Sequence, residues 1–233
     1  MQESASPYSK YGILAGELAK PFDEFGADFL PELARVIEAY AISGPLLCLE
    51  WGSGLSTQLL NDLVVRRGGF LVTLDDNPEY LAGVAGALSH RDVVEAIPAD
   101  LRGRIRGQEH EDRELAYSTA PLARGADFDL VLIDGRRRLE CSFSALLMAH
   151  EKSLVVLHDY RRARYQAVAA FYDTLELGNQ FRVMRPKPAV LAALAPARAE
   201  IRSSHRGLAS TPARPVKKQL HGWKRIWAKF KPR

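Results

Sequence analysis

The sequence predicts an α/β protein with a Rossmann-like, doubly wound sheet of seven mostly parallel strands, helices on both faces and a C-terminal antiparallel hairpin. Three observations predict it: apolar strand patterns alternate with helical patterns, a glycine turn joins the first such strand to a helix, and four strands end in acidic residues. The 233 residues, 47% of them hydrophobic, suffice for one buried core.

The glycine turn lies in the stretch LLCLEWGSGLST, residues 46–57. Residues 46–49 read as a strand buried on both faces, and the following helix is expected over 55–67. Glycines at this point allow a tight turn and let a ligand approach the backbone, while hydroxyl side chains can cap the helix. Strand, turn and helix N-terminus together predict a nucleotide-type site. Its candidate ligand-binding residues are Glu50, Gly52, Ser53, Gly54, Ser56 and Thr57.

A second strand is predicted over 70–74, and it ends in Asp75 and Asp76. Asp75 lies 21 residues after Gly54, close to the separation of about 20 at which a carboxylate can bind the ribose hydroxyls of a nucleotide. We expect Asp75 to bind ribose, with Asp76 as the alternative. A helix from Pro78 to about Ser89 follows.

The kind of nucleotide follows from two details. A dinucleotide motif would require a third glycine where Thr57 stands. Glu50, two residues before the first glycine, suits a cationic ligand better than a pyrophosphate. The pattern of Glu50, Gly52 and Gly54 resembles the first motif, E/D-x-G-x-G, of the class I S-adenosyl-L-methionine (SAM)-dependent methyltransferases. This resemblance implies that the chain binds SAM and transfers its methyl group.

The remaining elements are expected in order along the chain. Residues 1–42 are predicted to form a helical lid or cap, with helices over 11–20 and 31–41, and residues 43–196 to form the SAM-binding core. Further strands are expected over 104–108, 128–135, 153–157, 181–184 and 189–194, helices over 136–151 and 161–175, and a loop over 109–122.

The strands over 128–135 and 153–157 end in Asp134 and in His158-Asp159. Parallel strands present their carboxyl ends at one edge of the sheet, so these side chains are expected beside Glu50. Asp134 is a candidate for both cofactor binding and catalysis. His158 or Asp159 can serve as a general base that takes the proton from an acceptor hydroxyl.

The motifs IDG (133–135) and HDY (158–160) resemble those of sugar and other small-molecule O-methyltransferases of the macrocin type and, more distantly, catechol O-methyltransferase. The resemblance implies O-methylation and a divalent cation held by acids after these two strands. Asp134, His158 and Asp159 are the ligands if a metal binds. An imidazole in this set suits a transition metal better than Mg²⁺.

Residues beside these strand ends are candidates for binding the acceptor. Arg136 or Arg138 could hold an anionic acceptor such as a uronate or a phosphate-bearing glycan. Tyr160 is a further substrate-binding candidate. Nucleic acid is an unlikely substrate, because the sequence after Asp134 lacks the N/D-P-P-Y/F loop of enzymes that methylate exocyclic amines.

Charge divides the chain unevenly. Residues 197–233 carry a net charge of +10 and the remainder −6. We expect a linker over 197–215 and a basic amphipathic tail over 216–233, whose stripe from Val216 to Phe230 resembles a helix that binds an anionic membrane surface. Docking on the acidic body and nonspecific binding of nucleic acid are the alternatives for this tail. With two cysteines in predicted core elements and no signal peptide or membrane span, a cytoplasmic protein, peripheral at the inner face of the membrane, is expected.

Two other functions remain open from the sequence. One is a noncatalytic adaptor that binds SAM and acts through its basic tail. The other is an enzyme that uses NAD(P) on the same Rossmann-like fold.

Overall fold

A computed structural model describes residues 6–13, 15–18, 29–40, 44–101 and 108–205 of the chain. The strands are β1 (Leu47–Trp51), β2 (Phe70–Asp75), β3 (Val94–Pro98), β4 (Phe128–Ile133), β5 (Ala149–His158), β6 (Tyr172–Leu177) and β7 (Phe181–Pro186). The α-helices are α1 (Ala15–Leu18), α2 (Phe29–Ala39), α3 (Leu55–Arg67), α4 (Pro78–Ala87), α5 (Gln108–Thr119), α6 (Arg138–Leu147) and α7 (Pro188–His205). Short 3-10 helices are Ser9–Tyr11, Arg91–Val93, Ala120–Arg124 and Ala163–Ala170.

The seven strands form one sheet in the order β3-β2-β1-β4-β5-β7-β6. The first five strands along this order pair in parallel, and β7 is antiparallel to both β5 and β6. The chain reverses its direction of progress across the sheet between β1 and β4, which is where ligands bind in open α/β sheets. The predicted fold class is confirmed.

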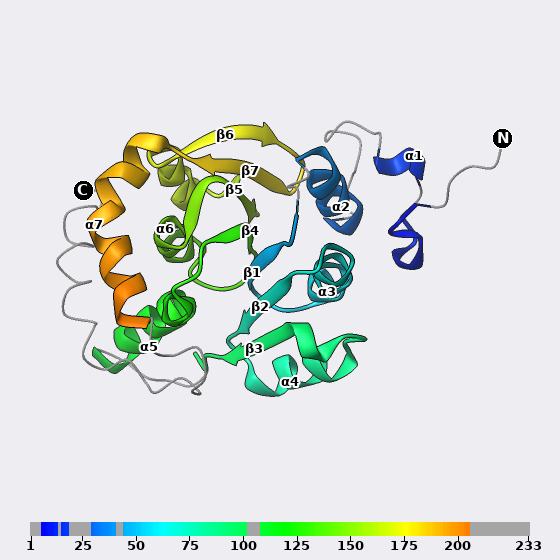
Figure 1. Cartoon of the computed structure of the whole chain (residues 1–233), viewed down its shortest axis with the longest axis horizontal. Helices are drawn as coiled ribbons and strands as arrows, with labels where there is room; N and C mark the ends of the chain where they lie inside the picture. Colours follow the sequence, from blue (N-terminus) through cyan, green and yellow to red (C-terminus); the bar gives the residue numbers. More distant parts are fainter. Residues whose placement is uncertain (1–5, 14, 19–28, 41–43, 102–107, 206–233) are drawn as a thin grey trace.

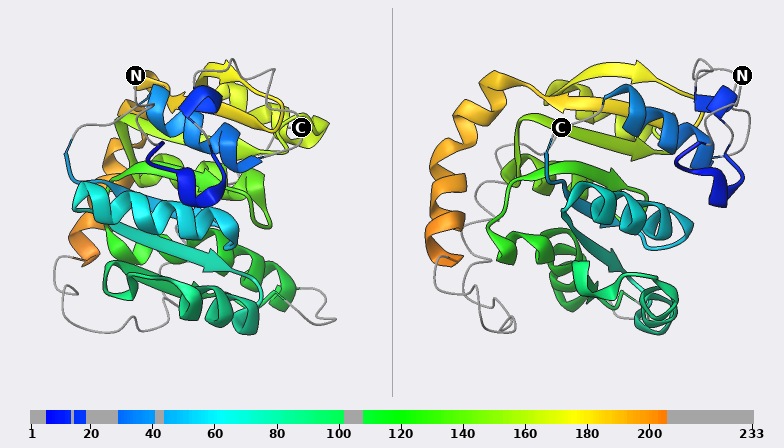
Figure 2. Two further views of the ribbon diagram at one scale, coloured as in Figure 1. Left: turned by 90° about the vertical axis from the view of Figure 1, so that its right-hand side faces the viewer. Right: turned by 45° about the vertical axis from the view of Figure 1, so that its right-hand side comes forward.

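Helices cover both faces of the sheet (Figure 1). Because side chains alternate between the faces of a strand, Cys48 packs with residues of α2 and α3, and its neighbour Leu49 packs with residues of α6. Figure 2 shows α7 on the opposite side of the sheet from α2 and α3. Both faces of β1 are therefore buried, as the apolar run of residues 46–49 predicts.

Local sequence signals mark the end of α3 and the start of α4. Gly68 adopts a left-handed φ of 64° at the C-terminus of α3, and its N–H donates to the carbonyls of Val64 and Val65. The side chain of Asn77 accepts from the backbone N–H of Tyr80 and caps α4, with Pro78 in the first turn. These signals are local, and the helix over 55–67 is confirmed.

Four predictions for the middle and end of the chain are wrong. The third strand is Val94–Pro98, whereas all but the last residue of the predicted range 104–108 lies outside the described residues. The expected loop over 109–122 forms α5 and a 3-10 helix. Residues 161–175 form a 3-10 helix and part of β6 instead of one long helix, so the terminal hairpin pairs β6 with β7. Residues 189–194, expected as a strand, belong to α7.

Helix α7 also changes the predicted boundary at residue 196. It continues through Pro196 to His205, so residues 197–205 are helix and not linker. Arg198 and Arg202 on α7 both pair with Asp127, at 3.1 Å for Arg198, which ties the helix to the sheet. The predicted tail, including Val216 to Phe230, lies outside the described residues, and its binding to a membrane stays a prediction.

Of the helices that the structure describes, none combines the length and apolar character that a membrane crossing requires. The described parts of the expected cap pack on the core. Tyr8 is fully buried and donates a hydrogen bond to Glu38 (2.8 Å), and Tyr11 donates one to Asp62. These tyrosines are packing residues.

Candidate functional site

The turns after β1 and β4 touch through their backbones. Gly52 has a φ of 94°, and a Cβ atom added to it would lie 2.5 Å from the backbone nitrogen of Gly135. The N–H of Asp134 donates to the carbonyl of Trp51 (2.8 Å), which continues the sheet pairing into the turns. Gly52 is therefore required by packing against the neighbouring turn, in addition to any role in ligand binding.

Glu50 lies beneath the glycine turn and is fully buried. Its carboxylate accepts hydrogen bonds from the hydroxyls of Ser56 (2.5 Å), Thr57 (2.6 Å) and Thr73 (2.7 Å). Thr57 also accepts from the backbone N–H of Gly54 (2.8 Å). Glu50, Ser56 and Thr57, predicted to contact the cofactor, thus join β1, β2 and α3 and shape the turn from inside.

Burial gives Glu50 an unusual acidity. It raises the pKa of Glu50 to about 7, although the three hydroxyl hydrogen bonds act in the opposite direction. Because the ordinary pKa is 4.5, the folded protein holds this proton more tightly than the unfolded chain, and stability is lost as the pH rises from 4.5 through 7.

The loss is roughly 2–3 kcal/mol between pH 5 and pH 8, and Glu50→Gln is expected to remove it. Urea unfolding of both proteins at the two pH values measures this. The free energy of unfolding of the variant, taken relative to that of wild type, is expected to be higher at pH 8 than at pH 5. An equal pH dependence in the two proteins would contradict it.

Asp75 connects the end of β2 to the glycine turn. It is almost fully buried, and its carboxylate accepts from the backbone N–H groups of Ser53 (3.1 Å) and Asn77 (2.8 Å). Burial raises the pKa of Asp75. Asp76, the alternative ribose ligand, is 3.4 Å from Arg136 Nε. Each Asp75 oxygen has a further lone pair, so a ribose hydroxyl can still bind there.

Gly54 leaves room for a ligand. Its φ is 170°, an extended conformation that any residue adopts, and a Cβ atom added to it would have the Tyr80 hydroxyl, 3.5 Å away, as its neighbour. Its small size is therefore explained neither by backbone strain nor by protein packing. The space beside Gly54, the Asp75 carboxylate and the α3 N-terminus fit a nucleoside cofactor at this position.

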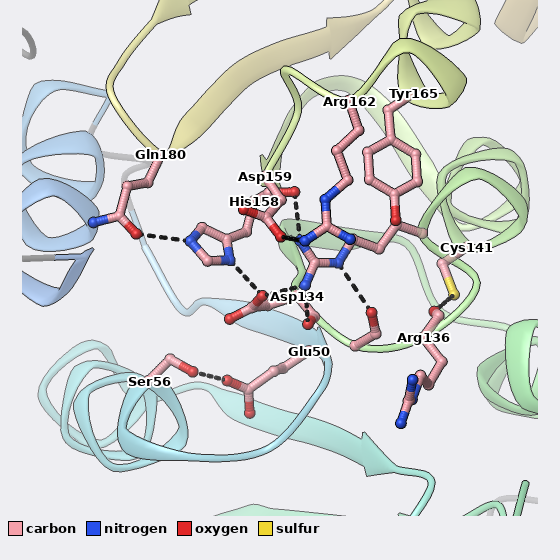
Figure 3. A network of polar contacts seen from close by, with 12 residues as sticks. Glu50, Ser56, Asp134, Arg136, Cys141, His158, Asp159, Arg162, Tyr165 and Gln180 are labelled. Atoms are coloured by element: carbon pink, nitrogen blue, oxygen red, sulfur yellow. Dashed lines mark hydrogen bonds and ion pairs between the residues drawn. The ribbon is translucent and has the colours of Figure 1, made fainter. Parts of the chain in front are cut away.

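On the other side of the β1–β4 junction, Asp134 and His158 form a direct pair. His158 Nδ1 is 2.5 Å from Asp134 Oδ1, and His158 Nε2 is 2.9 Å from Gln180 Oε1 (Figure 3). Burial lowers the pKa of His158, but the hydrogen bond and charge of Asp134 outweigh it, so the pKa is raised. The predicted meeting of Asp134 with the residues after β5 is confirmed.

Arg138 lies between the two acids of this cluster. It contacts the carboxylates of Asp134 (2.9 Å) and Asp159 (3.2 Å) and donates to the carbonyls of Gly135 (3.0 Å), His158 (2.8 Å) and Asp134 (2.9 Å). With its side chain only 13% exposed, Arg138 acts as an internal cross-link between the turns after β4 and β5. It is not available as the predicted acceptor ligand.

The predicted metal ligands do not fit a metal ion in this arrangement. The described residues include no group of three His, Cys, Asp or Glu side chains arranged to hold a metal ion. The cation between Asp134 and Asp159 is the guanidinium of Arg138, and His158 Nδ1 takes up Asp134 Oδ1. We therefore derive no step through a metal.

The structure also places the remaining substrate-binding candidates. Arg136 is exposed and reaches Asp76, whereas Tyr160 is buried and donates its hydroxyl to the Gly178 carbonyl (3.1 Å). Tyr160 thus supports the turn between β6 and β7. Gln180, in that same turn, is a site residue that no sequence motif signals.

Comparison with known proteins places this geometry in a fold family. Neither family models nor curated proteins gave a match. Among solved structures, the chain is similar to a methyltransferase-like protein from Silicibacter pomeroyi, with 21% identity, a TM-score of 0.52, and coverage of 72% of this chain and 93% of that one. It is likewise similar to cofactor-bound Rv0187 from MTB, with 19% identity, a TM-score of 0.52, and coverage of 78% and 90%.

At these identities the similarity establishes the fold. The strand order, the antiparallel C-terminal hairpin and the helices around the sheet agree with it. The chain has the Rossmann-like fold of the SAM-dependent methyltransferases.

Proposed function

We propose that this protein is a SAM-dependent methyltransferase that methylates a hydroxyl oxygen of a sugar, glycan or other small acceptor. The observation that supports it most is the arrangement around the β1–β4 junction. A glycine turn with free space at Gly54 and the buried Asp75 lies on one side, and the Asp134–His158 pair on the other. This arrangement offers a nucleoside site next to a proton acceptor.

The cofactor side is formed by the turn after β1 and the end of β2. SAM, when bound, supplies an electrophilic methyl group on a positively charged sulfur. Gly54 leaves the room, Asp75 accepts hydrogen bonds from the ribose, and Ser53 is held in place by Asp75 through its backbone N–H. Glu50 acts from below by fixing Ser56 and Thr57.

The acceptor side is formed by the turns after β4 and β5. Asp134 orients the His158 ring through Nδ1, which directs Nε2 to the side where Gln180 lies. In its neutral form, His158 can take the proton of an acceptor hydroxyl at Nε2 when that hydroxyl replaces Gln180. Asp159 is already engaged by Arg138 and Arg162, so His158 is the better base.

Two measurements test this function. Calorimetry is expected to show binding of SAM and of its demethylated product. Transfer of a radiolabelled methyl group to a panel of glycans and small alcohols is expected to identify an acceptor, and His158→Ala is expected to lower the rate by about 10²–10⁴-fold with cofactor affinity unchanged.

Asp134→Asn removes the carboxylate that raises the His158 pKa, so the acidic limb of the pH–rate profile is expected to shift to lower pH.

The alternatives give different results. An adaptor binds SAM and transfers no methyl group to any acceptor, and an NAD(P)-linked enzyme binds the nicotinamide cofactor in preference to SAM. Unchanged transfer by His158→Ala would eliminate His158 as the base while leaving cofactor binding to be judged by calorimetry.

A further inference from the structure

Two arginines that no motif singles out lie directly after β5, beside the proposed base. Arg161 and Arg162 are both exposed. Arg162 Nη2 is 2.6 Å from Asp159 Oδ2, and its side chain is 55% exposed. Figure 3 shows Arg162 extending toward Asp159. The guanidinium therefore stands at the acceptor side of the site with most of its donors directed to solvent.

The carboxylate that Arg162 contacts has a second cationic partner within the protein. Asp159 Oδ2 is also 3.2 Å from the largely enclosed Arg138, which contacts Asp134 as well. His158 adds a further partner for Asp134. With His158 neutral, as a general base must be, these two carboxylates are balanced by the two guanidinium groups of Arg138 and Arg162. These four charged groups therefore add no net negative charge that would repel an anion.

Arg161 is connected to His158 indirectly, through the turn between β6 and β7. Its Nε is 3.4 Å from the Tyr160 hydroxyl, which in turn donates to the carbonyl of Gly178. This is the turn that carries Gln180, the partner of His158 Nε2. The hydrogen bond with Tyr160 and, less strongly, the negative charge of Glu32 raise the pKa of Arg161. The Glu32 carboxylate is nevertheless fully buried, and it accepts hydrogen bonds from the backbone N–H groups of Gln180 and Phe181. Arg161 and Arg162 therefore place exposed positive charge at Tyr160 and Asp159, the two residues that follow His158 in the sequence.

We propose that the acceptor is an anion, and that Arg161 and Arg162 bind its carboxylate or phosphate group beside the hydroxyl to be methylated. This rests on the proposed function, and it specifies the substrate class. Guanidinium groups present paired donors that match the oxygens of carboxylates and phosphates, and exposed positive charge raises the local concentration of anions. Arg161 and Arg162, which are exposed, thus take the anion-binding role that the sequence predicted for Arg138.

Binding of matched sugars tests the proposal. Glucose, glucuronate and glucose 6-phosphate are titrated into the protein with and without the demethylated cofactor, and the dissociation constants are measured by calorimetry or ligand-observed NMR. The two anions are expected to bind at least about tenfold more tightly than glucose. In the double variant Arg161→Gln/Arg162→Gln this preference is expected to disappear. Comparison of the two anions shows whether carboxylate or phosphate is preferred.

A matched control separates a site from general surface charge. Arg113 is an exposed arginine on α5 that pairs with Glu109 (3.3 Å), and Arg113→Gln removes one charge there. The control is expected to keep the preference for anions. The proposal is overturned if glucose and the anions bind alike, or if Arg113→Gln weakens anion binding as much as Arg162→Gln does.

The result is also separable from the proposed function. Failure of SAM and its product to bind would contradict the methyltransferase function, while the anion preference is still measured without cofactor. Cofactor binding together with equal affinities for charged and neutral sugars would leave the methyltransferase proposal standing and remove this one. Arg161 and Arg162 are exposed, so thermal unfolding is expected to show their variants folded.

Discussion

Replacement of Arg138 by Met is expected to lower the free energy of unfolding by about 3–5 kcal/mol. The guanidinium of Arg138, whose side chain is only 13% exposed, contacts two carboxylates and three backbone carbonyls, and Met offers no donor to any of them. Asp134 and Asp159 would then lose the cation between them, and the turns after β4 and β5 would separate. Urea unfolding at neutral pH measures the loss.

Two further substitutions calibrate this result. Arg138→Lys keeps the charge but not the planar fork of donors, so an intermediate loss is expected. Arg113→Gln breaks an exposed pair within α5 and is expected to change stability by less than about 1 kcal/mol. If Arg138→Met proved as stable as Arg113→Gln, the cross-linking role of Arg138 would have to be abandoned.

Gly52→Ala is expected to have a comparable effect for a different reason. A φ of 94° disfavours any residue with a Cβ, and here that Cβ would meet the Gly135 nitrogen at 2.5 Å and the Asp134 carbonyl carbon at 2.8 Å. These are backbone atoms, so the two turns must move apart. We expect a loss of about 3–5 kcal/mol and a fall in Tm on the order of 10 °C, measured by calorimetry.

Gly54→Ala is the control for this prediction, because it lies two residues away in the same turn. Its extended backbone accepts alanine without strain, and the added methyl group meets the Tyr80 hydroxyl at an ordinary 3.5 Å. Stability is expected to stay near that of wild type, while the affinity for SAM falls as the methyl group fills the cofactor space. Equal destabilisation by both substitutions would contradict the distinction between a packing glycine and a ligand-binding glycine.

The sequence predicts the first half of the sheet well because its signals are local. A doubly buried strand needs a continuous apolar run, a tight turn needs glycine, and helix ends need caps, so β1, α3 and β2 can be read from a few neighbouring residues. The meeting of Asp134 with His158 follows from the parallel arrangement alone, since all parallel strands end at one edge.

Other elements depend on tertiary contacts that no short window of sequence contains. β3 is mixed in character, with Glu95 inside it, and its strand state comes from pairing with β2. β6 lies at the edge of the sheet with exposed polar residues, so its sequence pattern is weak. α5 is rich in charged residues, and its polar surface resembles a loop by composition. Pro196 suggests an end to the core, yet α7 continues through it.

Within the site, residue type was predicted better than contact. The acidic residues after the strands do gather, but Glu50 contacts hydroxyls of its own protein, and Arg138 bonds inward instead of toward a substrate. Whether an arginine at a helix start turns inward depends on the carbonyls and carboxylates around it, which come from two separate strands. Gln180 contacts His158 from a hairpin turn 22 residues away in the sequence, and no sequence motif predicts this contact for a glutamine.

The burial of Glu32 has a consequence for the N-terminal part of the chain. Its carboxylate, on α2, accepts the backbone N–H groups of Gln180 and Phe181. A truncated protein that begins at Gly44 would retain all seven strands but leave those N–H groups without this acceptor. The hairpin that positions Gln180 would then relax. The position of His158, the proposed base, would therefore depend on a segment that precedes the entire sheet.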